Sequence, residues 1–335
     1  MTAAAHPLSG WTPTELRWSG CRPVIRWCFS EGVRFIDPFF EQTIDRCLRD
    51  PFRLLFWRDT DAVALAELAA RAPGLPPDGL IFHMSRCGST LISQMLAALP
   101  QALVMSEPSP VDAVLRARIG PPGLSEDEAV DWLRWIVSAL GQPRAAGQRR
   151  YIVKLGAWAI LHLPLFRRAF PDARCVFVYR DPVEVIVSQL DARGVDLYPG
   201  SLPPGLVGLA VDDLPALGAE QYCAAVLSAL CESALDGARD GSLALIEYRM
   251  LPAAVADGVA PLFGLAVGAT ERAVLRDVSH RNAKHPARPF TADAQDKRRR
   301  STPAVQAAVT ARLRDAHAAL EAARAATDAT SPSAA

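Results

Sequence analysis

The sequence predicts an α/β protein, a three-layer sandwich in which helices cover both faces of a central parallel β-sheet. Two observations predict this fold class. Five short, continuous apolar runs follow residue 79, and such runs are typical of strands that are buried on both faces. Segments with the 3.6-residue period of amphipathic helices lie between these runs, and alternating strands and helices form parallel sheets.

The expected strands and helices follow in order along the chain. The strands occupy residues 80–84, 102–105, 151–153, 175–179 and 243–246. Helical patterns occupy residues 40–48, 60–72, 91–99, 125–136, 183–190 and 223–231, and a final amphipathic helix is expected over 305–320. Ser125 and Glu128 have the spacing of a capping box, which marks the start of one of these helices.

The remaining segments predict how the chain is organised. Residues 1–75 contain aromatics without a long regular period, and we interpret them as an N-terminal cap packed on a main domain of residues 76–326. Residues 191–219 hold five glycines and four prolines, and this connection is long enough to be a candidate substrate lid. Residues 279–301 are polar and basic, and residues 327–335 are expected to be a disordered tail.

Composition excludes several classes of protein. The chain of 335 residues has 36 basic and 36 acidic residues, so a nucleic-acid partner is not expected. It starts without the pattern of a secretory signal, and its most apolar long stretch is interrupted by proline, glycine and aspartate, so no membrane partner is expected. Seven cysteines without paired spacing indicate neither a disulfide framework nor a zinc site. We expect a cytoplasmic protein without a metal, of open oligomeric state.

A phosphate-binding turn is expected directly after the first of the five strands. It comprises Ser85, Arg86, Cys87, Gly88, Ser89 and Thr90. Where a strand ends and a helix starts, backbone N–H groups point outward without partners, and the helix dipole favours an anion. Gly88 allows close backbone approach, while Arg86 adds a positive charge. A simple capped turn is the alternative, and the GxxxxGK[ST] pattern of nucleotide triphosphatases is missing.

A second turn of this kind follows the fourth expected strand. Asp181 and Pro182 suit the N-cap and the first helical position. Arg180 ends the strand at the carboxyl edge of the sheet, where α/β proteins bind ligands, and Ser188 lies in the following helix. An arginine and a hydroxyl at that edge can bind a second phosphate, whereas a triphosphatase would carry a magnesium-binding acid there. An ion pair of Arg180 with Asp181 or Glu184 is the alternative.

Together the two turns resemble one family. SRCGST at 85–90 and RDPxxxxxS at 180–188 resemble the turns of sulfotransferases that use 3′-phosphoadenosine 5′-phosphosulfate (PAPS), particularly the bacterial, carbohydrate and tyrosyl-protein branches. The resemblance covers roughly residues 78–300. It implies a P-loop, nucleotide-kinase-like fold in which the first turn binds the 5′-phosphosulfate and the second binds the 3′-phosphate. It also implies metal-free sulfuryl transfer from PAPS to a hydroxyl or amine of an unidentified small-molecule or carbohydrate-type acceptor.

The resemblance also assigns roles to residues near the C-terminus. Tyr248 follows the last strand in a segment that looks like one near the family's donor nucleotide, with core packing as the alternative. The basic segment 279–301 resembles a loop that closes over the product, adenosine 3′,5′-bisphosphate. Within it we expect Ser279, Arg281 and Lys284 to contact phosphate.

Glu107, Lys154 and Arg86 are the catalytic candidates. Glu107 follows the second expected strand, and in related branches a glutamate is the base, although a surface acid or a salt bridge is the alternative. Lys154 matches the family's usual cation near the donor sulfate. The cytosolic branch has a catalytic histidine two residues after this lysine, where this chain has Gly156. His83 lies inside the first strand and is expected to be a packed residue.

Two other functions stay open at this point. A kinase-like phosphotransferase using ATP and magnesium would need a metal-binding acid near the first turn, and the sequence offers none there. A non-catalytic nucleotide-binding protein would keep the fold without turnover.

Overall fold

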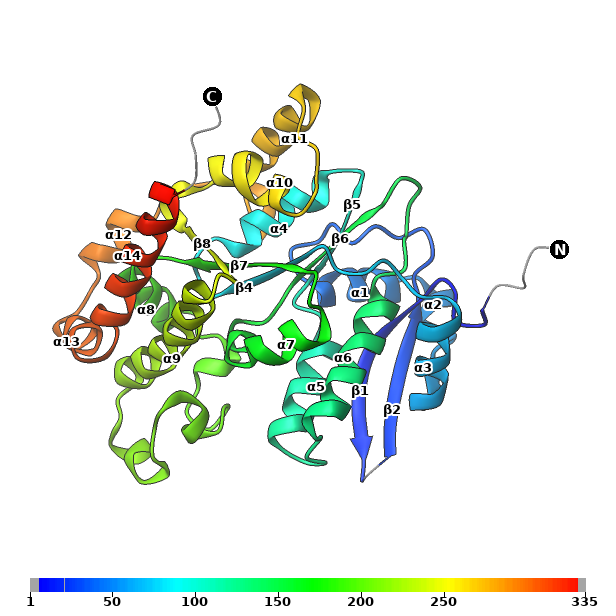
Figure 1. Ribbon diagram of the computed structural model, residues 1–335, viewed down its shortest axis with the longest axis horizontal. Coiled ribbons are helices and arrows are strands. Elements are labelled where there is room, and N and C mark those ends of the chain that lie inside the picture. Colours follow the sequence, from blue (N-terminus) through cyan, green and yellow to red (C-terminus); the bar gives the residue numbers. More distant parts are fainter. Residues whose placement is uncertain (1–5, 21, 331–335) are drawn as a thin grey trace.

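The computed structural model describes residues 6–20 and 22–330, and its centre is a five-stranded, all-parallel β-sheet. The strand order is β5-β6-β4-β7-β8 (Figure 1). The strands are β4 (Gly79–His83), β5 (Ala102–Ser106), β6 (Arg150–Lys154), β7 (Arg174–Tyr179) and β8 (Ala244–Glu247). Each lies within about one residue of its expected position, because a doubly buried strand needs a continuous apolar run. The predicted fold class is confirmed.

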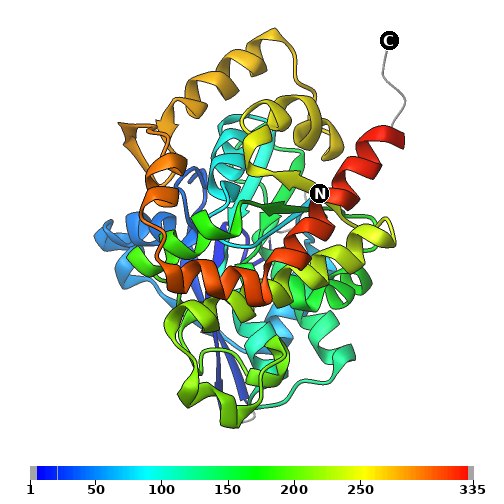
Figure 2. The same ribbon diagram turned by 90° about the vertical axis from the view of Figure 1, so that its left-hand side faces the viewer.

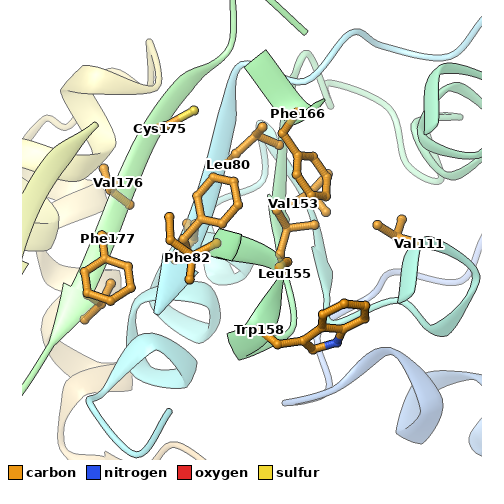
Figure 3. Close-up of a cluster of buried hydrophobic side chains, with 14 of the residues drawn as sticks. Leu80, Phe82, Val111, Val153, Leu155, Trp158, Phe166, Cys175, Val176 and Phe177 are labelled. Carbon is orange, nitrogen blue, oxygen red and sulfur yellow. The ribbon is translucent and has the colours of Figure 1, made fainter. Parts of the chain in front are cut away.

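Helices cover both faces of this sheet (Figures 1 and 2). One face carries α4 (Ser89–Ala98), α10 (Ala260–Leu262) and α11 (Ala269–Ser279). The other carries α5 (Ser109–Ile119), α6 (Glu126–Leu140), α7 (Leu163–Ala169) and α9 (Ala219–Arg239). On this second face Phe82 of β4 packs edge-on against Phe166 of α7, with ring centroids 5.5 Å apart, within a buried apolar cluster (Figure 3). The capping box of Ser125 and Glu128 forms as predicted.

The N-terminal region contains a small antiparallel sheet that the sequence analysis did not predict. Its elements are β1 (Trp11–Ser19), β2 (Arg22–Phe29), β3 (Arg58–Thr60), α1 (Phe40–Leu48), α2 (Pro51–Leu55) and α3 (Ala62–Arg71). The sheet packs against α5 and α6, where Trp18 meets Trp132 edge-on at 5.7 Å. A register shift between Pro13 and Glu15 interrupts the alternation that would have marked β1 as a strand.

The end of the chain differs from the prediction in two respects. The expected helix over 305–320 is two helices, α13 (Pro303–Arg312) and α14 (Arg314–Thr330), which meet at Leu313. The apolar spacing runs through this break, since Leu313 and Leu320 are both buried, and it therefore concealed the break. Because α14 reaches Thr330, residues 327–330 are helical where a disordered tail was expected, and 331–335 lie outside the described residues.

Two segments contribute residues to the carboxyl edge of the sheet. Residues 191–219 follow α8 (Pro182–Asp191) and form three short 3₁₀ turns. Residues 279–301 form the two-stranded ribbon of β9 (Arg281–Asn282) and β10 (His285–Pro289), followed by α12 (Ala294–Arg299). Within the described part of the chain, none of the helices has the length and apolar character needed to cross a membrane.

Candidate active site

A cavity of about 380 Å³ opens at the carboxyl edge of the sheet, and both predicted anion-binding turns line it. The turns belong to β4 and β7, which are direct neighbours in the sheet. The predicted site residues that line the cavity are Ser85, Arg86, Cys87, Gly88, Ser89, Thr90, Glu107, Arg180, Ser188, Tyr248, Arg281 and Lys284. Residues from five separate parts of the sequence therefore share one space.

The first turn has the backbone geometry of a tight loop before a helix. Gly88 is the N-cap of α4 with a φ of 87°, and no side chain caps this helix. A Cβ at Gly88 would lie 2.7 Å from Leu251 and 2.9 Å from Tyr248, so both conformation and space require glycine. Ser85 and Arg86 also have positive φ values, of 68° and 51°. Such strain gathers at functional sites, and the uncapped amides of α4 are available to an anion.

Three ionisable side chains meet beside this turn. Lys154 is fully buried and forms an ion pair with Glu107, and its Nζ lies 3.4 Å from Thr90 Oγ1. His83 Nε2 lies 3.4 Å from Oε1 of Glu107. Glu107 has a φ of 56°, and its backbone N–H donates to the Lys154 carbonyl at 2.6 Å. Lys154 thus reaches the cavity through its two partners rather than by lining it.

The environment of Glu107 controls its charge. Burial alone would raise the pKa of this carboxyl, but the Lys154 ammonium and His83 outweigh burial and hold the pKa well below its ordinary value. Burial lowers the pKa of His83, and the charge of Lys154 lowers it further, so the imidazole is neutral. At rest the site therefore contains an ionised Glu107 whose charge Lys154 offsets.

Lys284 of the basic segment 279–301 lies near the cations of the first turn. The pKa of Lys284 is lowered to about 8 by burial first, and then by the charges of Arg86 and Lys154. Both lysines also lie near the ring of Phe39, with Lys154 Nζ 5.1 Å and Lys284 Nζ 5.8 Å from its centroid. Arg86 donates to the carbonyl of Ala192. Cations that repel one another in this way favour a bound anion.

The second turn brings Arg180 into a buried network of charges. Arg180 donates from Nε to Glu184 at 2.6 Å and from Nη2 to Asp293 at 2.8 Å. Its guanidinium also lies 4.0 Å from the centroid of the Tyr248 ring. Lys297 contacts the other oxygen of Asp293 at 2.7 Å. The alternative of an ion pair with Glu184 is thus present, and it coexists with a position in the wall of the cavity.

Some residues lie elsewhere than expected or were missed. Ser279 does not line the cavity, because its hydroxyl donates to the Arg276 carbonyl within α11. Phe39 and Asp293 line it without any motif that indicates them. Gln189 links the two loops, since its Nε2 donates to Ser85 Oγ at 2.8 Å and its Oε1 accepts from the Gly194 N–H at 2.9 Å. Its position directly after Ser188 is the one feature of the sequence that could have indicated a role for Gln189 at this site.

A smaller cavity of about 200 Å³ lies on another side of Glu107. Glu107, Val195 and Asp196 line both cavities. Arg116 of α5 holds Asp196 at 2.8 Å and Asp112 at 2.6 Å, which ties the segment 191–219 to the wall of the smaller cavity. Burial, followed by the charge of Asp112, raises the pKa of Asp196 to about 6.

Residues 80–193 match the family model described as the Sulfotransferase family. This region, about a third of the chain, is similar to the sulfotransferase family. The matched region contains both turns, Glu107 and Lys154, whereas Tyr248 and the segment 279–301 lie beyond it. The match supports a transferase activity, and the family resemblance stated from the sequence is confirmed.

Solved structures similar to this chain are distant in sequence. One is sulfotransferase STF9 from Mycobacterium avium, at 16% identity and a TM-score of 0.45, with 73% of this chain and 77% of that chain covered. Another is the sulfotransferase domain of the Synechococcus PCC 7002 olefin synthase, at 15% identity and a TM-score of 0.42, with 72% and 96% covered. No curated protein matches the chain.

Proposed function

We propose that this protein is a sulfotransferase that moves the sulfuryl group of PAPS to a hydroxyl or amine of a small acceptor. The observation that carries the proposal is the single cavity shared by the two turns, each of which contributes an arginine to its wall. In this proposal the amides of α4, Arg86 and Lys284 bind the 5′-phosphosulfate, and Arg180 with Ser188 binds the 3′-phosphate. Within the described residues, no group of three or more His, Cys, Asp or Glu side chains has the arrangement of a metal site.

The reaction is an in-line displacement at sulfur. An acceptor oxygen or nitrogen forms a bond to sulfur while the bond from sulfur to the bridging phosphate oxygen breaks. Adenosine 3′,5′-bisphosphate leaves with the electron pair, and the acceptor proton goes to the Glu107 carboxylate. The smaller cavity on the other side of Glu107 is our candidate for the acceptor, with Asp196 of the segment 191–219 in its wall.

Because Glu107 pairs with Lys154, the basicity of Glu107 depends on whether PAPS is bound. While Lys154 neutralises the carboxylate, Glu107 is a weak base. A bound phosphosulfate competes for the same ammonium, which raises the pKa of Glu107 and makes it a stronger base. Lys154 in turn stabilises the negative charge that develops on the leaving phosphate.

Calorimetry with two nucleotides tests the donor. We expect adenosine 3′,5′-bisphosphate to bind at least ten times more tightly than ATP with magnesium, because the 3′-phosphate meets Arg180 and Ser188. An assay with labelled PAPS and a broad panel of small hydroxyl and amine acceptors then tests transfer. Preferential binding of ATP with magnesium would contradict the proposal, and binding of the bisphosphate without transfer to any acceptor would favour a non-catalytic protein.

Replacement of the proposed base tests the chemistry. Glu107→Gln should lower kcat by about 100- to 10,000-fold, the range for loss of a general base, while the bisphosphate binds more tightly because its phosphate no longer competes with Glu107 for Lys154. Glu67→Gln, which alters an exposed carboxyl of α3 outside both cavities, is the control for kcat. Unchanged turnover in Glu107→Gln would remove Glu107 as the base.

A further inference from the structure

His83 is a buried polar residue that the proposed mechanism leaves without a role. It ends β4 with only 4% of its surface exposed, and it lines the larger cavity. From the sequence alone His83 is expected to be a packed residue, because a lone histidine in an apolar strand gives no further signal. Its neighbours in the structure are polar, which a packing role does not require.

The hydrogen bonds of His83 fix its tautomer. The backbone N–H of Ser85 donates to Nδ1 at 3.0 Å, so Nδ1 carries a lone pair and the single ring proton lies on Nε2. Nε2 is 3.4 Å from Oε1 of Glu107, is buried and makes no hydrogen bond among the described residues. The imidazole thus places one unsatisfied N–H donor beside the proposed base, and with this tautomer Nε2 cannot itself accept a proton.

Two side chains, one a cation and the other an N–H donor, therefore lie next to the same oxygen, Oε1 of Glu107. Lys154 reaches Glu107 Oε1 from β6, and His83 reaches it from β4. The charged or polar groups facing His83 are these two residues together with the backbone of Ser85 and of Leu155. When bound PAPS pairs with Lys154, His83 is the remaining group that can hold the Glu107 carboxylate in place.

We propose that His83 is a positioning residue for Glu107, which holds the carboxylate toward the acceptor through Nε2–H while Lys154 serves the donor. This inference rests on the proposed function. It also connects the first turn to the base, since the amide of Ser85 orients the ring that orients Glu107. Binding at the first turn and alignment of the base are thereby coupled through a single imidazole.

Two carboxamide variants separate the two nitrogens of the ring. His83→Asn retains an acceptor near Nδ1 for the Ser85 amide and is too short to reach Glu107. His83→Gln retains a donor near Nε2 at the distance of Glu107. We expect His83→Asn to lower kcat by about 10- to 100-fold, with the KM for donor within about twofold, and His83→Gln to recover at least about fivefold of that loss.

The pH profile provides a readout that a packing role would not move. A hydrogen bond to the ionised carboxylate lowers its pKa, so its loss in His83→Asn should shift the acid limb of kcat/KM to higher pH. An Asn variant with the wild-type kcat and acid limb would overturn the inference. Equal losses of kcat and of thermal stability in both variants would also overturn it, because they would show packing alone.

Imidazole ¹⁵N spectra separate this inference from the proposed function. In the wild-type protein they should show the Nε2–H tautomer of His83 at neutral pH, with a shifted Nε2 signal in Glu107→Gln. If this contact is present and no acceptor is sulfated, the proposed function fails while the contact stands. If PAPS transfer occurs and the Nδ1–H tautomer is found, the inference about His83 fails alone.

Discussion

The two ends of the larger cavity differ in how their charges are balanced. At the first turn, the three cations Arg86, Lys154 and Lys284 lie beside the carboxylate of Glu107. Burial first, and then the charges of Arg86 and Lys154, lower the pKa of Lys284. At the second turn, a charge network of alternating sign neutralises itself; its members are Arg180, Lys297, Arg298, Asp181, Glu184 and Asp293. The first end is thus short of negative charge, whereas the second supplies its own.

This difference indicates how each end would receive a phosphate. An anion at the first turn relieves repulsion among cations that are already in place, so binding there needs little rearrangement. An anion at the second turn competes with Asp293 for Arg180 and Lys297, and the segment that carries Asp293 must adjust. Variants at each end can sharpen or break this contrast.

Among changes at the two ends of the cavity, Arg180→Ala is expected to have the largest effect on donor affinity. Loss of a charge-assisted hydrogen bond should weaken binding of adenosine 3′,5′-bisphosphate by about 1.5–3 kcal/mol, or about 10- to 150-fold in Kd. Calorimetry measures this change. Arg298→Ala is the matched control, because Arg298 contacts the same Glu184 at 2.8 Å without lining the larger cavity. Equal affinity in Arg180→Ala and the wild type would remove the second turn from the donor site.

A smaller effect, specific to the first end, is expected from pH. A bound anion favours the charged form of Lys284, whose pKa in the free protein is about 8, so affinity is full below pH 8 and falls as pH rises through it. Between pH 7 and pH 9 we expect about a tenfold loss in affinity for the bisphosphate. Lys284→Met should bind more weakly at pH 7 and show a flatter pH dependence. An equally steep loss in this variant would assign the titration to another group.

The sequence predicted those parts of the molecule that depend on local chemistry. The five strands, the N-cap of Asp181 and the two turns were predicted because buried strands and helix starts need particular residues nearby in sequence. Contacts between distant segments were not predictable in this way. Phe39 reaches the cavity from the N-terminal region, and Asp293 reaches Arg180 across 113 positions, with no pattern at either residue.

Histidine 83 shows the same limit at closer range. Its burial followed from its place in β4, but its proximity to Glu107 joins the ends of two different strands, and Glu107 has a positive φ of 56°. A positive φ in a residue other than glycine is uncommon, and the sequence SEPSP at 106–110 does not indicate one. The two prolines of that motif indicated only that the strand ends there.

The smallest effect, and the sharpest test of the contrast between the two ends, is expected from Asp293→Asn. Burial would raise the pKa of Asp293, but Arg180 and Lys297 outweigh it and lower the pKa. A carboxylate whose pKa is lower in the folded protein than in the unfolded chain contributes stability at pH values above the unfolded pKa. This contribution is lost as pH falls through the folded pKa. Asp293→Asn lacks it, so this variant should melt at a lower temperature than the wild type at pH 7. Without the competing carboxylate, Arg180 and Lys297 become available to a ligand.

Asp293→Asn should therefore bind adenosine 3′,5′-bisphosphate about three to ten times more tightly, an opposite change to its loss of stability. Asp296→Asn, which removes a charge from the same helix outside the cavity, is the control for general electrostatics. Calorimetry and thermal unfolding on the same samples measure both quantities. Weaker binding together with lower stability would show that Asp293 orients Arg180 for the ligand, and the second end would then be as ready for an anion as the first.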